Sequence, residues 1–287
     1  MSLRKSPSNS STRRRSAAAL ASAALLACAM GVAIPAQASA LPTLTVAISP
    51  ASITVSGATQ SGGVNVVATD AGLKEASAVL FLLKPGVSAA EFLAVVESKA
   101  GKDPNNADKY GSIAFDAEVV PGHSTEAQTY LQTGQYVAIA LTGEGKPKAH
   151  STFAVTAAPA PAALPTPQAT IRSIEFGFRG PATIHDGELV RFENEGFLVH
   201  MDIAFPVKSK TAARQVVADL LAGKEKSIQK YVAGEPFSFA GPLSSGAYQQ
   251  ETITAKPGWY VQACFMETQD GRDHTRLGME RIIKIAA

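Results

Sequence analysis

Short runs of apolar and β-branched residues, separated by turn residues, make up most of the chain after its first forty positions. Val, Ile, Phe and Thr recur within the runs, and Gly, Pro, Asn and Asp stand between them. Many short strands with turns between them are typical of an antiparallel sandwich. The predicted strands are 43–48, 64–68, 78–83, 136–141, 171–178, 189–193, 201–205, 251–254, 260–265 and 281–285.

Two segments interrupt this pattern with a helical one. Ser88-Ala89-Ala90-Glu91 has the sequence of a capping box, and apolar residues follow at helical spacing from Phe92. Residues 211–221 form the counterpart, which ends at Gly223. We expect one helix in each half of the chain, closing one side of a sandwich.

The two halves of the chain look like copies of one another. A shift of 124 positions aligns four glycines without a gap and places Tyr136-Val137 on Tyr260-Val261. Glycines mark turns that other residues fit poorly, so shared positions indicate a shared backbone path. We therefore predict an internal duplication. The aligned pairs are Gly63 with Gly187, Gly72 with Gly196, Gly122 with Gly246, and Gly134 with Gly258.

A Pro- and Ala-rich, uncharged segment at 155–169 lies between the copies. This composition is typical of a semi-rigid, extended linker. The predicted domains are a first half at 41–157 and a second half at 170–287, joined by a linker at 158–169. The fold class that follows is all-β, with two tandem antiparallel β-sandwiches that each carry a helical insertion.

The first forty residues are predicted to be a signal peptide. Arg13–Arg15 form a positive region, residues 17–34 are small and apolar, and Ala38-Ser39-Ala40 is an A-x-A cleavage site. We expect a mature chain that starts near Leu41 and is secreted or lies in the cell envelope or periplasm. A single membrane span is the alternative, but the run is Ala-rich and slightly short. No later segment approaches the length of a span, so none is expected in the mature chain.

Two details of this segment leave alternatives open. The arginines loosely resemble a twin-arginine signal, but Ser16-Ala17-Ala18 replaces the hydrophobic residues expected after the pair. Leu25-Leu26-Ala27-Cys28 loosely resembles a lipobox, which would make Cys28 a lipid-anchored N-terminus. The apolar run continues to Ile34, so simple cleavage is favoured.

Charge and cysteine content narrow the function. A net charge of +2 with 17% charged residues gives no sign of a nucleic-acid-binding surface, so no nucleic-acid partner is expected. Removal of Cys28 with the signal leaves Cys264 as the single thiol of the exported protein. A lone thiol in an oxidising compartment is explained either by burial as a small apolar side chain or by metal ligation.

Cys264 shares its part of the chain with other soft ligands. His274 and Met279 follow it, and His200 precedes an apolar run earlier in the second half. Two imidazoles and a thiolate in a trigonal plane, with a weak axial thioether, suit copper better than calcium or magnesium. We predict one copper ion in the second half, with Met266 as an alternative sulfur ligand. The predicted ligands are His200, Cys264, His274 and Met279.

These residues stand in motifs that resemble those of the cupredoxins, the blue-copper fold of plastocyanin, azurin and the copper nitrite reductases. Gly187 precedes a V-x-F-x-N strand at 190–194 and His200, and the closing motif is Pro257-Gly258, Tyr260, Cys264, His274 and Gly278-Met279. The resemblance covers about 170–287. It implies a cupredoxin-like sandwich with a copper site. The loop between Cys264 and His274 is longer than in small blue-copper proteins and comparable to that of the nitrite reductases.

The first half departs from this pattern. Under the same shift, Ala76 stands at the place of His200, Ala140 at that of Cys264, and Val155 at that of Met279, while His150 is kept. A lone histidine cannot form this site. We interpret the first half as a metal-free scaffold or docking module.

The leading hypothesis is an exported copper-binding protein, not an enzyme, that carries single electrons to or from a redox partner protein or holds copper. A metal-free binding or structural module is the alternative, and it requires His200 and Cys264 to lie too far apart for one ion. A Cys–His hydrolase using Cys264, His274 and Asp273 is disfavoured, because no oxyanion-hole signature accompanies them.

Overall fold

The computed structural model describes residues 40–142 and 147–287. The predicted signal peptide, including Cys28, lies outside the described residues apart from Ala40, so export and lipid anchoring stay predictions. None of the helices in the described part is long and apolar enough to cross a membrane.

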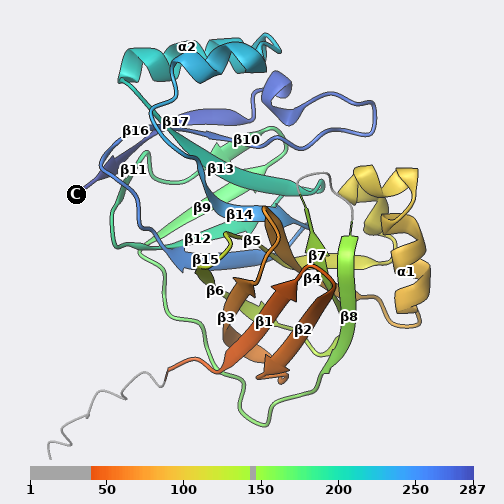
Figure 1. The fold of residues 1–287 in the computed structure, drawn as a ribbon. Helices are drawn as coiled ribbons and strands as arrows, with labels where there is room; N and C mark the ends of the chain where they lie inside the picture. The colour runs from red at the N-terminus through yellow and green to blue at the C-terminus, as the bar shows by residue number, and fades with distance from the viewer. Residues whose placement is uncertain (1–39, 143–146) are drawn as a thin grey trace, which may run out of the picture. The chain divides into compact units, whose positions relative to one another are not determined.

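The first half consists of eight strands, one α-helix and two 3-10 helices (Figure 1). The helix α1 spans Ala89–Val96, and η1 (Lys99–Lys102) and η2 (Pro104–Ala107) follow it. The strands are β1 (Thr43–Ser49), β2 (Ser52–Gly57), β3 (Gly62–Asp70), β4 (Ala76–Leu83), β5 (Gly111–Val119), β6 (Ser124–Leu131), β7 (Gly134–Leu141) and β8 (Pro147–Val155).

The second half follows a similar order with one further strand, and it contains α2 at Lys210–Leu221 and the 3-10 helices η3 (Glu225–Lys230) and η4 (His274–Leu277). Its strands are β9 (Ala169–Ile174), β10 (Gly177–Arg179), β11 (Thr183–His185), β12 (Leu189–Asn194), β13 (His200–Val207), β14 (Phe237–Leu243), β15 (Tyr248–Thr252), β16 (Gly258–Ala263) and β17 (Glu280–Ala286). The predominance of strands confirms the all-β class, and α1 and α2 confirm a helical insertion in each half.

The sheet order repeats between the halves. One four-stranded sheet runs β5-β4-β7-β8, and the second half holds the matching order β14-β13-β16-β17, extended by β11. The shift that aligned the glycines also places β4 on β13 residue for residue. Most strand pairs are antiparallel, but three pair in parallel: β1 with β3, β9 with β12, and β11 with β17. The duplication read from the glycines thus has a counterpart in the order of the strands.

The remaining strands of both halves form one eight-stranded sheet. Its order, β10-β9-β12-β15-β6-β3-β1-β2, places the matching strands in mirrored order about the junction of β15 and β6. At this junction Gln249 pairs with Thr129 and Gln250 with Gln128. The Gln250 Nε2 also donates to the Gln128 Oε1 at 2.9 Å. Each half therefore contributes four strands to one sheet that the two halves share.

Alternating burial explains why these segments form strands. In β1, Leu44, Val46 and Ile48 are buried and the residues between them are more exposed, which is the period of two that a half-buried strand requires. In α1, the Ser88 side chain accepts from the Glu91 N–H and the Glu91 side chain accepts from the Ser88 N–H. This reciprocal pair is the predicted capping box.

One predicted strand is wrong in a way that matters for the site. The segment 171–178 was expected to be continuous, but β9 ends at Ile174 and β10 begins at Gly177. Between them Phe176 adopts a φ of 57°, which is uncommon for a residue other than glycine, so the chain turns. The turn at Glu175-Phe176 places both side chains beside the predicted ligands. Strands β2, β5, β6, β8, β11 and β14 had no counterpart among the predictions.

Candidate metal centre

Three of the four predicted ligands meet at one point. His200 is the first residue of β13, Cys264 directly follows β16, and His274 is the first residue of η4. Their ligand atoms all lie within 4.8 Å of one another, and all three side chains are fully buried. No other group of three such residues was found in 40–142 and 147–287.

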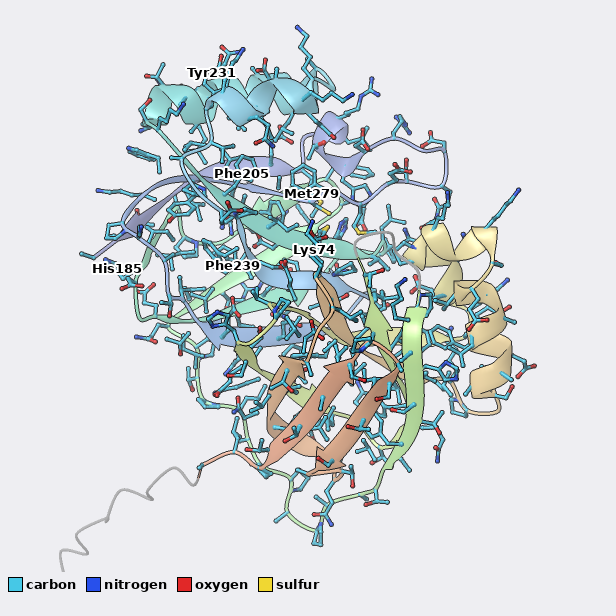
Figure 2. The ribbon with its side chains drawn as sticks, in the orientation of Figure 1. Lys74, His185, Phe205, Tyr231, Phe239 and Met279 are labelled. Carbon is cyan, nitrogen blue, oxygen red and sulfur yellow. The ribbon has the colours of Figure 1, made fainter. Side chains whose placement is uncertain are left out.

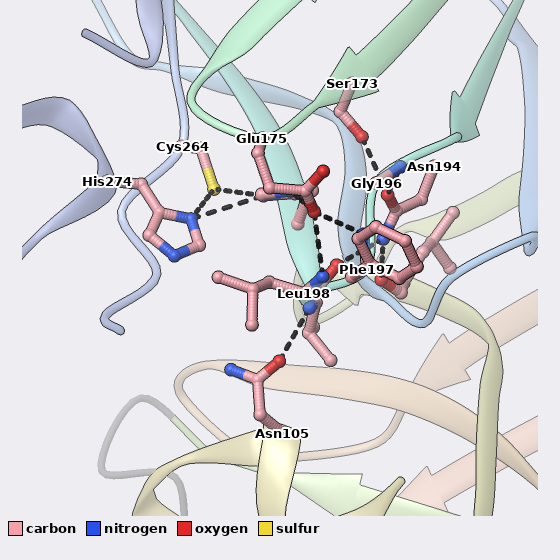
Figure 3. Close-up of polar contacts among 12 residues, drawn as sticks. Asn105, Ser173, Glu175, Asn194, Gly196, Phe197, Leu198, Cys264 and His274 are labelled. Atoms are coloured by element: carbon pink, nitrogen blue, oxygen red, sulfur yellow. Dashed lines mark hydrogen bonds and ion pairs between the residues drawn. The ribbon is translucent and has the colours of Figure 1, made fainter. Parts of the chain in front are cut away.

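The donor atoms form a small triangle, of which Figure 3 labels Cys264 and His274. The His200 Nδ1 lies 3.2 Å from the His274 Nδ1, and the Cys264 Sγ lies 3.8 Å and 3.4 Å from these two nitrogens, respectively. Bonds of about 2.0–2.3 Å that meet at about 120° separate their donor atoms by about 3.5–3.8 Å. The triangle is close to the size that one first-row transition-metal ion requires.

The protons available to these atoms also favour an ion. A neutral imidazole carries one N–H, and a thiol carries one weak S–H. The Nε2 atoms of His200 and His274 are both buried without a hydrogen-bond partner among the described residues. Whichever ring nitrogen holds the proton, at least one buried nitrogen is left without a good partner. A cation in the triangle would accept all three lone pairs at once, so the residues present fit a metal.

Burial keeps the thiol and both imidazoles neutral in the metal-free protein. It raises the pKa of Cys264 to about 12, although backbone N–H groups of Met201 and Met266 act in the opposite direction. Burial, followed by the neighbouring His274, lowers the pKa of His200 to about 4. Burial also lowers the pKa of His274. Both imidazoles therefore offer lone pairs at neutral pH, and a metal would displace the thiol proton.

Backbone hydrogen bonds hold the segment 264–279 in place. The His274 N–H donates to the Met266 carbonyl at 2.8 Å, and the Met279 N–H donates to the His274 carbonyl at 3.0 Å. The Cys264 N–H donates to the Met279 carbonyl at 3.1 Å. Gly278, at the end of η4, has a φ of 98°, a conformation that favours glycine. After η4 the chain thereby returns to the end of β16, where Met279 lies beside Cys264.

The two predicted sulfur ligands differ in their surroundings. Met279 is fully buried and stands between η4 and β17 (Figure 2). Met266 is only partly buried and packs against the hydrophobic core. The burial of Met279 and its backbone bond to Cys264 keep it the stronger candidate for the axial position, which stays a prediction.

The turn before β13 is organised by Asn194. Its Nδ2 donates to the Leu198 and Leu243 carbonyls, each at 2.8 Å, and its Oδ1 accepts from the Gly196 N–H at 2.9 Å. The Ser173 hydroxyl also donates to Oδ1 at 3.2 Å. All polar atoms of this buried amide are used, so the segment 194–200 has a fixed course into His200.

Glu175 contacts the same turn. One of its carboxylate oxygens, Oε1, accepts from the Phe197 N–H and, at 3.1 Å, from the Leu198 N–H. Burial raises the pKa of Glu175, but these backbone N–H groups outweigh it and hold the pKa below its ordinary value. The side chain is therefore ionised at neutral pH. Nearby, the Phe176 ring packs edge-on against the His274 ring, with centroids 5.2 Å apart.

The first half also contacts the site. The Asn105 side-chain oxygen, at η2, accepts from the Val199 N–H at 2.7 Å (Figure 3). Val199 is fully buried and precedes His200 in the chain. In the first half itself, Ala76 and Ala140 are buried at the places of His200 and Cys264, while His150 is exposed. This half thus contributes a contact to the site but no ligand set of its own among its described residues.

The geometry weighs against the two alternative functions. The metal-free alternative requires His200 and Cys264 to be well separated, but the Nδ1 and the Sγ are 3.8 Å apart. The hydrolase alternative requires a reactive thiolate, whereas burial raises the pKa of Cys264 far above that of a nucleophilic cysteine. Asp273 is adjacent to His274 but lies outside the clustered group.

Neither Glu175 nor Asn105 was among the predicted site residues. Glu175 was assigned to the interior of a strand, and Asn105 lies 94 positions before its partner Val199. Gly196 was aligned with Gly72 and stands in the motif before His200, but the close approach of Glu175 and His200 that it allows was not predicted. The one local signal in the sequence was Gly196-Phe197 after the V-x-F-x-N strand, since a glycine allows other groups to come close to the backbone before His200.

Comparison with known proteins returned structural likenesses alone. No family model matches the sequence, and no curated protein matches it. Auracyanin A, a "blue" copper protein from Chloroflexus aurantiacus, is 19% identical, with 41% of this chain and 98% of that chain covered and a TM-score of 0.24. A Cu-containing nitrite reductase from Thermus scotoductus is 14% identical over 85% of this chain and 68% of that chain, with a TM-score of 0.25. A multi-copper oxidase from Pseudomonas thermotolerans is 10% identical over 85% and 67%, with a TM-score of 0.22.

These proteins are of the kind that the sequence motifs resemble. The identities and TM-scores are low, so the function of this chain has to follow from its own residues. One expectation is corrected by the comparison. The chain was expected not to be an enzyme, but the similar structures include a nitrite reductase and a multi-copper oxidase, which are enzymes. The likeness therefore gives no ground for excluding catalysis.

Proposed function

We propose that this protein would bind one copper ion through His200, Cys264 and His274, with the Met279 thioether as a fourth, weaker ligand. The observation that carries the proposal is the buried triangle of two imidazole nitrogens and one sulfur. This donor set and its trigonal arrangement suit copper, and Cu(II) binds such ligands more tightly than the other divalent first-row ions do. Copper, when bound, supplies reversible one-electron oxidation and reduction.

The residues around the triangle support this role. Both imidazoles are neutral at pH 7 because burial lowers the pKa of each ring. The Met201 N–H donates to the Cys264 Sγ at 3.4 Å, which stabilises negative charge on the sulfur. Because the donors are buried, water is kept from the site. A site that is already assembled needs little rearrangement, and this property suits an electron carrier.

We further propose that the protein works outside the cytoplasm, where it either exchanges electrons with a redox partner protein or holds copper. The predicted signal peptide and the single thiol of the mature chain support this location. The first half is proposed to act as a scaffold, in line with the Asn105 contact to the turn before His200.

Addition of Cu(II) to the purified protein tests the copper site. We expect one copper per chain and an intense visible band from thiolate-to-copper charge transfer. Cys264→Ser and His274→Gln are expected to abolish this band. His150→Gln is the matched control, since His150 is the exposed counterpart of His274 in the first half, and it should leave the spectrum unchanged. A folded, reduced wild-type protein that binds no copper would contradict the proposal.

A further inference from the structure

The Glu175 carboxylate lies next to the imidazole of His200. Glu175 stands in the turn between β9 and β10, and its Oε1 is 3.8 Å from the His200 Nε2. This nitrogen belongs to the same ring as Nδ1 but lies on its far side from the donor triangle. Figure 3 shows the carboxylate directed at the turn that leads into His200.

The backbone at Gly196 allows this approach. A Cβ at residue 196 would lie 2.7 Å from the Glu175 Oε1 and 2.8 Å from the His200 Nε2. The carboxylate and the ring therefore meet at a position that only glycine leaves open. The buried Nε2 has no hydrogen-bond partner among the described residues, so Glu175 is the anionic group available to it.

We propose that Glu175 is the positioning residue of the metal centre. Its negative charge favours the proton on the Nε2 of His200, which leaves the lone pair on Nδ1 facing the Cys264 Sγ and the His274 Nδ1. The same charge makes the imidazole a stronger donor, as carboxylates do for histidine ligands of metals. This inference rests on the proposed function, because it assigns a role to Glu175 at that same site.

Glu175 also has a structural role that the experiment must separate from this one. Its Oε1 accepts the Phe197 and Leu198 N–H groups and so holds the turn before β13. A glutamine keeps an acceptor oxygen for both N–H groups but carries no charge. Glu175→Gln therefore retains the structural role and removes the charge that acts on His200.

The test compares the full chain with its Glu175→Gln variant by competition of a copper chelator for Cu(II). We expect the variant to bind Cu(II) about 10- to 100-fold more weakly. Its copper reduction potential should rise, since loss of a negative charge disfavours the more highly charged ion. The metal-free variant should unfold at the wild-type temperature, and Glu175→Asp should restore part of the affinity.

Glu195→Gln is the matched control. Glu195 directly follows β12, and its carboxylate pairs with the Arg172 Nε at 2.9 Å rather than with His200. It should leave both the affinity and the potential unchanged. If wild-type protein shows no thiolate-to-copper band, the proposed function fails and this inference fails with it. If wild-type protein binds copper but Glu175→Gln binds within twofold of it, the inference alone is overturned. The inference would also be overturned if metal-free Glu175→Gln lost as much unfolding free energy as it lost in copper-binding free energy, because a structural role would then explain both losses.

Discussion

His200 is held neutral by its surroundings, and this has a measurable cost in the metal-free protein. Its pKa falls to about 4 in the folded state because of burial and of the neighbouring His274. In the unfolded chain it titrates near its ordinary value of 6.5. Between these two values the unfolded state binds one more proton than the folded state. The folded state therefore loses stability as the pH falls from about 6.5 toward 4.

We predict that this loss disappears in His200→Gln. In the metal-free state, the free energy of unfolding of the variant minus that of wild type should be about 2–3 kcal/mol more positive at pH 4.5 than at pH 7. Denaturant titrations at the two pH values measure the difference. The comparison must be with wild type, because burial raises the pKa of Asp202 and of Glu251 to about 8 and gives the opposite slope. Parallel profiles for wild type and His200→Gln would contradict the prediction.

The sequence identified the metal donors because their chemistry is visible in residue types and order. Cys264 is the single thiol left after the predicted cleavage, and His274 and Met279 follow it in a recognisable motif. Glu175 could not be identified in this way. Its position depends on the positive φ of Phe176, a conformation that nothing in the local composition signals.

At the scale of single elements, the turn between β12 and β13 determines where β13 begins and so where its first residue, His200, lies. Asn194 fixes the turn from inside, and Glu175 holds it from outside. The strands on either side were predicted within one or two residues, because burial alternates along them. The course of the turn was not predicted, since it depends on side chains that arrive from β9 and η2.

Gly196→Ala tests how closely this turn is fitted. A methyl group would lie within 3 Å of both the Glu175 carboxylate and the His200 ring, so one of them must move. We expect a loss of about 1–3 kcal/mol in the free energy of unfolding and weaker copper binding. Thermal unfolding and chelator competition measure the two effects.

Gly258→Ala provides the comparison for this variant. A Cβ at position 258 would meet its nearest atom, the Tyr260 Cε2, at 3.9 Å, which is an ordinary contact. It should leave copper affinity at the wild-type level. If Gly196→Ala behaves like Gly258→Ala, the turn is looser than the structure indicates.

At the scale of the whole molecule, the duplication places the two halves on a common sheet. The two copies meet at β6 and β15, so the strand order on one side repeats in reverse on the other. The duplication itself could be read from glycine positions. The joint sheet could not, because each half supplies only a few residues to the junction and the sequence does not record which strand edges pair.

Contact between the halves gives a prediction about Asn105. Asn105→Ala leaves the buried Val199 N–H without its acceptor, which costs about 1–3 kcal/mol. We expect lower thermal stability and weaker copper binding, since Val199 precedes His200. Asn105→Asp retains an acceptor oxygen but loses the amide that donates to the Asp103 Oδ1 at 2.8 Å, so repulsion between the two carboxylates should prevent a full recovery of either property.

Asn106→Ala serves as the control for this experiment. Asn106 is exposed, and its Nδ2 donates to the Ala100 carbonyl within the first half. It should leave copper affinity unchanged. Equal copper affinity in Asn105→Ala and wild type would show that the first half does not support the site.

Because His200, Cys264 and His274 have no exposed surface, the ion has no open path to them from solvent. Entry of an ion would then require the segment around η4 or the turn before β13 to move outward. The rates of metal binding and release should therefore depend on how often these segments open rather than on the strength of the bonds to the metal. Exchange of the proposed copper with a chelator should therefore be slow, and a competition experiment needs time to reach equilibrium.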